Sequence, residues 1–163
     1  MKKSIFAKII TVIMAIVLVA GGVSFPAKAA AKGYQFKNKG VTIAMHDAAK
    51  KFIKKAGKPE KTKVTKSCAY KGKDRTYQYQ DFILYTYSNS DKGAEYVNGI
   101  VFRTSNVSTK EGIKIGSSEA DMIKKYGKGT SRFGIYTYKK AKCKLQFEVT
   151  DGKVTNIRYT AVK

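Results

Sequence analysis

The chain has few side chains suited to catalytic or metal chemistry. Its only histidine is His46, and its two cysteines are Cys68 and Cys143. A catalytic triad needs a histidine beside a nucleophile and a third group that orients the ring, whereas a lone histidine at an expected helix start is typical of a capping or surface residue. Zinc needs about four cysteine or histidine ligands, and no glycine-rich phosphate-binding motif is present. We therefore expect no catalytic residue, no metal site, no cofactor and no enzymatic activity.

The two cysteines leave two interpretations open. An even number of cysteines favours a disulfide where a chain is exported, and a bridge between Cys68 and Cys143 would join the two halves of the chain. In the chain-entropy description, a bridge closing so long a loop would stabilise the fold by about 4 kcal/mol. In the alternative interpretation, each cysteine is a small apolar residue buried on its own strand.

Six tyrosines in expected strands are the candidate partner-binding residues. They are Tyr77, Tyr79, Tyr85 and Tyr87 in the first half and Tyr136 and Tyr138 in the second. Residues two apart on a strand share a face, so we expect Tyr77 and Tyr79 to share one face. The same holds for Tyr85 and Tyr87. Tyrosine is a favoured interface residue because it offers a large contact area. These side chains form either an exposed aromatic sheet surface for a partner or ordinary core and edge positions.

The charge balance favours anionic partners. The chain has 33 lysines and arginines against 11 aspartates and glutamates, which gives a formal net charge of +22. The candidate anion-binding lysines are Lys50, Lys51, Lys54, Lys55, Lys124, Lys125, Lys139 and Lys140. Lysine dominates over arginine, although arginine is preferred for reading bases or phosphates in fixed geometry. We expect loose, salt-sensitive attachment to anionic polymers rather than sequence-specific nucleic-acid recognition; the alternative is a lysine-rich surface that is merely solvated.

Residues 1–31 have the three-part pattern of a secretory signal peptide. Lys2 and Lys3 precede an apolar run, and small residues allow cleavage after Ala29 or Ala31. An uncleaved anchor is the alternative, but the apolar run is short for a membrane span of ~20 residues. Cleavage would remove four lysines and lower the net charge from +22 to +18. We expect a secreted, extracellular protein without a transmembrane segment, released or held at the cell wall by charge.

Two helices and a set of strands are expected to position these side chains. The first helix is predicted over 46–56, because apolar residues recur from Ala48 at helical spacing. Asp47 would lie in its first turn, and Gly57 and Pro59 would end it. After a capping serine at 117 or 118, the second helix is predicted to end at Tyr126.

The remaining segments alternate as strands do. Strands are predicted over 41–43, 66–70, 75–79, 82–87, 96–104, 133–138, 143–150 and 154–160, after a polar lead-in over 32–39. Asp151-Gly152 is a strong two-residue hairpin signal between the last two strands. The pattern indicates an α+β fold in a single compact domain over 32–163, made of repeat 1 (about 40–105) and repeat 2 (about 109–163).

Each half resembles the unit of the β-lactamase-inhibitor-protein-like fold, which is shared with the SmpA/OmlA lipoprotein domain. The motif is an apolar-Gly-small stretch and a short helix ending in Gly-x-Pro. Ile115-Gly116-Ser117 and Tyr126-Gly127 match it in the second half, although Gly129 stands where proline would, and Gly57-Lys58-Pro59 matches it in the first. The resemblance implies two tandem helix-plus-antiparallel-sheet repeats with both helices packed on one side of the sheet.

The chain is also similar to exported proteins of Gram-positive bacteria whose function is unknown, through the stretches 40–43, 67–74, 109–113 and 153–157. Because such folds host many unrelated roles, the function expected is that of a secreted, non-catalytic binding module of the cell envelope. Its tyrosine-bearing sheet surface would contact a protein partner, and its lysines an anionic cell-wall polymer. One alternative is a secreted enzyme-inhibitor-like protein. The other is a non-specific binder of extracellular nucleic acid or anionic membrane.

Overall fold

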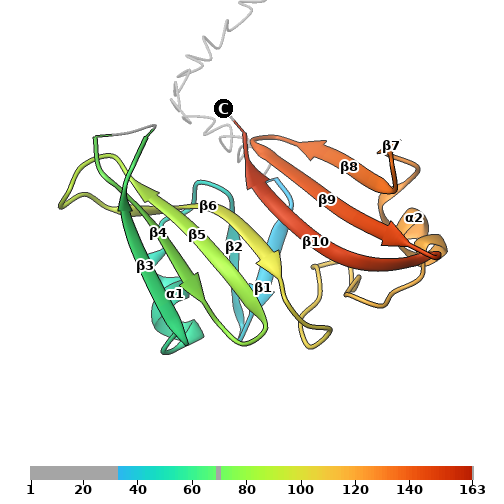
Figure 1. Ribbon diagram of the computed structural model, residues 1–163, viewed down its shortest axis with the longest axis horizontal. Coiled ribbons are helices and arrows are strands. Elements are labelled where there is room, and N and C mark those ends of the chain that lie inside the picture. Colours follow the sequence, from blue (N-terminus) through green and yellow to red (C-terminus); the bar gives the residue numbers. More distant parts are fainter. Residues whose placement is uncertain (1–32, 69–70, 163) are drawn as a thin grey trace, which may run out of the picture.

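The computed structural model describes residues 33–68 and 71–162, and the expected signal peptide over 1–31 lies outside them. The fold is α+β, with every strand pair antiparallel. A two-stranded hairpin of β1 (Gln35–Asn38) and β2 (Val41–Ala44) accompanies an eight-stranded sheet of order β3-β4-β5-β6-β10-β9-β8-β7. Figure 1 shows the eight strands as one twisted surface.

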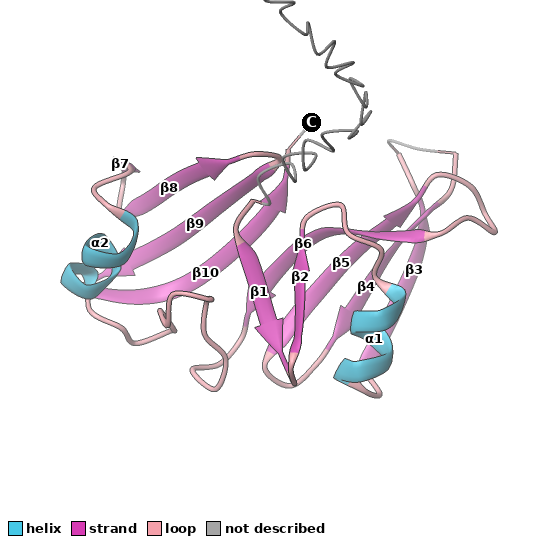
Figure 2. Cartoon of the chain, turned by 180° about the vertical axis from the view of Figure 1, so that it is seen from behind, coloured by secondary structure: helices cyan, strands magenta, loops and turns pink. Residues whose placement is uncertain are grey.

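Each half of the chain supplies one helix and four consecutive strands. The first half has α1 (Lys50–Ala56), β3 (Lys61–Lys66), β4 (Lys73–Gln78), β5 (Phe82–Ser88) and β6 (Glu95–Phe102). The second has α2 (Glu119–Tyr126), β7 (Thr130–Arg132), β8 (Ile135–Lys140), β9 (Cys143–Thr150) and β10 (Lys153–Ala161). The halves meet where β10 pairs with β6. Seen from behind, α1 and the β1–β2 hairpin lie in front of the strands of the first half (Figure 2).

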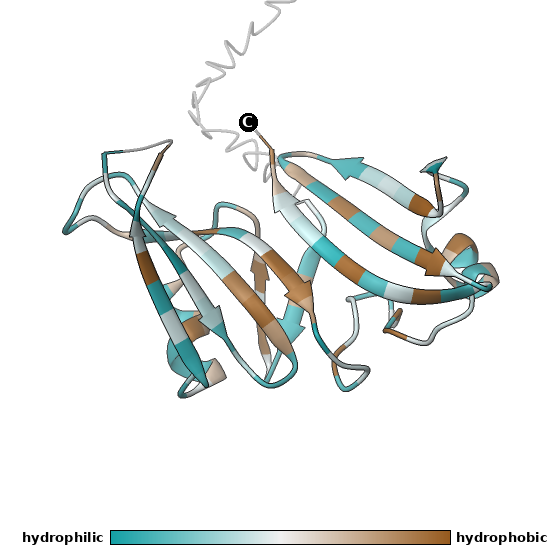
Figure 3. Ribbon diagram, in the orientation of Figure 1, coloured by the Kyte–Doolittle hydropathy of each residue, from teal (hydrophilic) through white to brown (hydrophobic). Residues whose placement is uncertain are grey.

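Strand β9 shows why these segments form a sheet with one buried face. Leu145 and Phe147 are completely buried, whereas Gln146 and Glu148 between them are partly exposed. This alternation has the period of two that a strand requires, and Figure 3 shows a matching alternation of hydrophobic and hydrophilic residues along β9 and β10. The predicted hairpin after β9 is confirmed: Asp151 and Gly152 have positive φ values of 49° and 67°, as a two-residue turn of this hand requires.

The core extends across both halves, and Phe36 lies at its centre. Phe36 is 0% exposed, and its ring centroid lies 5.2 Å from those of Phe82 and Phe102 and 6.4 Å from that of Tyr159. The β1–β2 hairpin therefore packs against strands of both halves. The prediction of a polar lead-in over 32–39 was wrong, because the alternation that buries Phe36 on β1 is only four residues long.

Helix α1 begins at Lys50, four residues later than predicted. The preceding segment extends the sheet instead: the His46 amide donates to the Val97 carbonyl at 2.8 Å, and the Ala49 amide donates to the Glu95 carbonyl at 2.8 Å. The Asp47 carboxylate accepts a hydrogen bond from the Ala44 amide at 2.9 Å, so it does not lie in the first turn of the helix. β10 does not pair with the first residues of β6. These residues pair instead with the segment before α1, and this pairing decides where the helix starts.

Two strand predictions need correction at their ends. The strand predicted over 66–70 is instead β3, which ends at Lys66, and residues 69 and 70 lie outside the described part. The strand predicted over 133–138 starts at Ile135, and Phe133 occupies a turn after the unpredicted short strand β7. Both misplaced boundaries involve exposed edge strands, whose hydrophobic pattern is weak because little of either strand is buried.

The predicted disulfide is absent. Cys68 is exposed after β3, Cys143 is 1% exposed at the start of β9, and both are free. Four strands lie between β3 and β9 in the sheet, so with strands about 4.8 Å apart the two are on the order of 20 Å from each other, whereas a disulfide needs Cα atoms about 4–7 Å apart. Cys143 is a buried small residue, and burial raises the pKa of its thiol to about 11.

Candidate binding surfaces

Three of the six candidate tyrosines belong to the core and cannot form a partner surface. Tyr79, Tyr87 and Tyr138 are 6%, 8% and 5% exposed. The Tyr138 hydroxyl donates to the Gly127 carbonyl at 2.7 Å, and burial raises the pKa of Tyr138 to about 12. The Tyr87 hydroxyl lies 3.1 Å from His46 Nδ1, and His46 Nε2 lies 3.2 Å from the Val162 carbonyl oxygen. His46 therefore links the end of the chain just after β10 to β5.

Tyr77 and Tyr136 are half-buried, and each donates its hydroxyl to a glutamate. Tyr136 bonds Glu119 on α2, and this bond is the main cause of its raised pKa. Tyr77 bonds Glu95 Oε2 at 3.1 Å, and burial followed by this hydrogen bond raises its pKa to about 12. Tyr136 thereby ties β8 to α2, whereas Tyr77 on β4 bonds a residue of β6 in the same sheet, and in both cases the tyrosine hydroxyl is already occupied.

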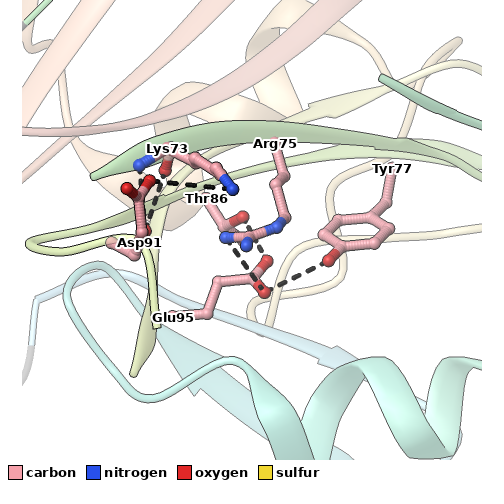
Figure 4. Close-up of polar contacts among 7 residues, drawn as sticks. Lys73, Arg75, Tyr77, Thr86, Asp91 and Glu95 are labelled. Atoms are coloured by element: carbon pink, nitrogen blue, oxygen red, sulfur yellow. Dashed lines mark hydrogen bonds and ion pairs between the residues drawn. The ribbon is translucent and has the colours of Figure 1, made fainter. Parts of the chain in front are cut away.

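Glu95 is the centre of a larger polar cluster (Figure 4). Besides Tyr77, its carboxylate accepts the Thr86 hydroxyl, and Arg75 Nη1 lies 3.7 Å from Oε2. The side chains of Arg75 and Glu95 are only 20% and 19% exposed. Removal of one partner from such a pair leaves an uncompensated charge, so this cluster is a structural support of the first half.

Tyr85 is the remaining candidate and lies on the face of the sheet opposite the β1–β2 hairpin, called the open face below. It is 37% exposed and sits opposite Gly99 on β6. A Cβ at Gly99 would lie 3.6 Å from the Tyr85 ring and 3.1 Å from the Tyr159 carbonyl oxygen. The ring therefore covers a glycine backbone, and the structure does not gather the six tyrosines into one aromatic surface.

All eight candidate lysines are exposed, but they form separate groups. Four lie on α1, two near the end of α2, and Lys139 and Lys140 on β8. Figure 2 places the two helices at opposite ends of the molecule. Within the described residues there are three ion pairs, and Lys73 with Asp91 is the only one that involves a lysine. The positive charge is thus spread over the surface without matching acids.

One hollow lies beside α1, with a volume of about 700 Å³. Lys50 and Lys54 from the helix and Lys92 from the β5–β6 loop line it, together with Ile53 and the Tyr77–Glu95 pair. Lys50 and Lys54 are four residues apart, so they share one helix face and repel each other. An anionic group in this hollow would relieve that repulsion, which makes it a candidate anion site.

A second candidate site is a chain of three hollows across the open face, called the open-face groove below. Their volumes are about 230, 180 and 390 Å³. Arg158 lines the first two, and Ile135 and Gln146 line the last two. Tyr85 lies at the first end, and Phe133 and Arg132 lie at the other.

Phe133 is the most exposed large apolar side chain of the described residues, at 93%. It occupies the two-residue turn between β7 and β8 with φ 49°, a left-handed conformation that costs a non-glycine residue about 1 kcal/mol or more. Gly134 follows with φ 74°, and its carbonyl accepts the Val149 amide at 2.8 Å. The Arg132 guanidinium lies 5.7 Å from the ring centroid. Neither packing nor turn preference explains a phenylalanine here.

Phe133 was not among the predicted binding residues, because its segment was predicted to be a strand. The dipeptide Phe133-Gly134 lies between two β-prone stretches. Two residues are the length of a typical hairpin turn, so the sequence did contain a signal for a turn here. Gln146 and Arg158 were also missed, since nothing in their local sequence distinguishes a groove-lining residue from any other exposed strand position. Their relation appears only when β9 and β10 pair, which sets Arg158 opposite Gln146.

Within the described residues, no group of three or more histidine, cysteine, aspartate or glutamate side chains could hold a metal ion. No helix in this part of the chain is long and apolar enough to cross a membrane. Comparisons with protein-family models, with curated proteins and with solved structures found no match. The class of the protein therefore follows from its fold and surfaces: an α+β protein with exposed lysines in separate groups over its surface and a grooved sheet face.

Proposed function

We propose that this protein is an exported, non-catalytic binding module of the cell envelope that attaches to anionic surface polymers through its lysines. The observation that carries the proposal is the excess of exposed lysines without acidic partners. A large unpaired positive charge attracts polyanions at long range and repels positively charged partners. The hollow beside α1, with Lys50, Lys54 and Lys92, is where this attraction would be strongest.

The signal-peptide pattern over 1–31 supports export, and the matching order of elements in the two halves supports their origin as tandem repeats. In this proposal both repeats have the helix-plus-antiparallel-sheet unit of the β-lactamase-inhibitor-protein-like and SmpA/OmlA domains, with both helices on one side of the sheet. The pairing of β6 with β10 would then be the contact between repeats. The proposal places the module outside the cell, at or near the wall.

A salt titration tests the attachment. The protein without residues 1–31 is mixed with purified Gram-positive cell wall, either intact or stripped of teichoic acid, and the bound fraction is measured between low salt and ~0.5 M salt, where screening leaves only short-range attraction. Binding should require the polymer and disappear as salt rises. Binding that survives high salt, or no binding at any salt, contradicts attachment by charge. A parallel arm with duplex DNA tests non-specific nucleic-acid binding.

A second candidate is an inhibitor-like protein that docks the open face on one protein partner, and the exposure of Phe133 favours it. Exposed aromatic side chains on a rigid turn act as anchors in protein interfaces. An inhibitor predicts a tight complex with one protein that tolerates salt, whereas attachment by charge predicts weak binding to many anions. Phe133→Ala should weaken the former and leave the latter unchanged.

A further inference from the structure

We propose that the open-face groove binds a single strand of an acidic glycan, a chain of sugar rings that carries carboxylates. The inference deepens the proposed envelope attachment and rests on it for the kind of polymer, but it concerns a defined site rather than the whole charged surface. Four observations carry it: the shape of the groove, the order of its side chains, its charge and the position of Phe133.

The groove is long and crosses the strands. Register sets Val101 opposite Arg158, Arg158 opposite Gln146, Gln146 opposite Thr137 and Thr137 opposite Thr130. This row runs from β6 to β7, and at a strand spacing of about 4.8 Å it extends for about 20 Å. A site of this length and limited depth suits an extended chain better than a compact small molecule.

The side chains along the groove are mainly polar in the middle, with an aromatic ring at each end. Four polar side chains and Ile135 line the central hollow, whereas the aromatic rings of Tyr85 and Phe133 lie among polar side chains at the two ends; the four are Gln146, Glu148, Asn156 and Arg158. Protein interfaces have the opposite plan, with an apolar centre and a polar rim. A central row of amide and charged groups is suited to a partner that presents many hydroxyl groups, and this favours a glycan over a protein.

The charge of the groove is positive. Arg132, Lys139 and Arg158 line it against the single acid Glu148. Lys139 also sits directly opposite Lys144 on the neighbouring strand, and like charges in that position repel. Carboxylates on the glycan would pair with these cations.

Phe133 completes the site at one end. Its ring is presented by a turn that the hydrogen bond from Val149 holds in place, and it stands beside the hollow that contains Ile135 and Thr137. A flat, rigid apolar surface next to hydrogen-bonding groups lets the apolar face of a sugar ring stack while its hydroxyls bond to the protein. The unfavourable backbone conformation of Phe133 is then explained by function.

The test measures binding of a galacturonic acid oligosaccharide by calorimetry at moderate salt, with the fully methyl-esterified oligosaccharide as an uncharged control. We expect the acid form to bind at least tenfold more tightly than the ester. Phe133→Asn should weaken binding at least tenfold while the melting temperature stays equal or rises, because asparagine accepts the left-handed turn more easily than phenylalanine. Val64→Ala is the matched control: Val64 is 52% exposed on β3, far from the groove, and its loss should not change binding.

Three results would overturn the proposal: no binding of the acid form, equal binding of the ester, or unchanged binding by the Phe133→Asn variant. A salt-resistant complex of a purified protein at this face in place of glycan binding would also overturn it. The wall titration is separate. If the protein does not bind cell wall but does bind the oligosaccharide, attachment by charge is contradicted and the groove proposal is supported. If the protein binds cell wall but not the oligosaccharide, only the groove proposal is contradicted.

Discussion

Helices α1 and α2 each precede four consecutive strands but are stabilised differently. Four of the seven residues of α1 are lysines, its first turn has no acid, and Ala49 before it provides no side-chain cap. Helix α2 is capped by Ser118, whose hydroxyl accepts the Asp121 amide at 3.0 Å, and it has Glu119 and Asp121 in its first turn. Thus α2 is supported by local interactions, whereas α1 depends on packing through Phe52 and Ala56.

The two halves also differ in how they use their sheet faces. In the first half the polar cluster of Arg75, Tyr77 and Glu95 lies beside α1, next to the lysine-lined hollow. In the second half two of the three groove hollows lie on the open face, over β7 to β10. One arrangement of elements therefore supports two different kinds of surface, as expected when function depends on sites rather than on the fold.

The largest expected effect comes from removing the residue that joins the halves. Phe36→Ala should lower the free energy of unfolding by about 3–5 kcal/mol, since a buried phenylalanine leaves a large cavity. Urea unfolding followed by circular dichroism measures this loss. The exposed Val64→Ala variant should lose almost nothing. An equal loss in both variants would contradict the central position of Phe36.

Alkaline pH should destabilise both halves through Tyr77 and Tyr138. Their pKa values are raised from 10.0 to about 12 in the folded protein. Both contribute their full stability below pH 10; between about pH 10 and 12 the unfolded chain loses its protons first, so stability falls. Thermal melts at pH 9 and 11.5 measure the fall, and Tyr77→Phe should reduce it. A midpoint that does not change over this range would contradict the prediction.

Removing the N-terminal cap of α2 should destabilise the protein, whereas introducing a serine at the corresponding position before α1 should not stabilise it. Ser118→Ala should lower the free energy of unfolding by about 1 kcal/mol. Ala49→Ser should bring no gain, because Ala49 is buried and has helical angles of φ −79° and ψ −21° rather than the extended geometry of a cap. Paired urea titrations test both. A stabilised Ala49→Ser variant would show that the two helix starts are more alike than described here.

The smallest effect concerns the charges of the two helices. Lys51→Glu should stabilise α1 by about 0.2–0.5 kcal/mol, because it replaces a repulsive pair with Lys55 by an attractive one and places an acid near the helix start. Lys125→Glu should destabilise α2 by a similar amount, because it places an acid near the helix end. Thermal melts of both variants and of the unmodified protein at low salt measure the sign of each change in melting temperature. Shifts of the same sign in both variants would contradict the comparison.

The sequence predicted those elements whose patterns are strong and local. The residues of β9 alternate regularly between buried and exposed, and the Asp151-Gly152 turn and the Ser118 cap are encoded within a few residues. The start of α1 could not be predicted, because Glu95 and Val97, far along the chain, pair with the segment before it. The tyrosines show the same limit: alternation gives the shared face of Tyr77 and Tyr79, but not which face is covered.

By itself, the sequence determined the α+β class and the excess of positive charge, since composition and local periodicity are properties of the chain alone. Only the tertiary structure decided that Cys68 and Cys143 are too far apart to bond, that three of the six candidate tyrosines are buried, and that Gln146 and Arg158 share a groove. The physical reason is that strand order and register bring together residues from distant parts of the chain. A chain's local pattern fixes which residues alternate, but not which strand lies beside them.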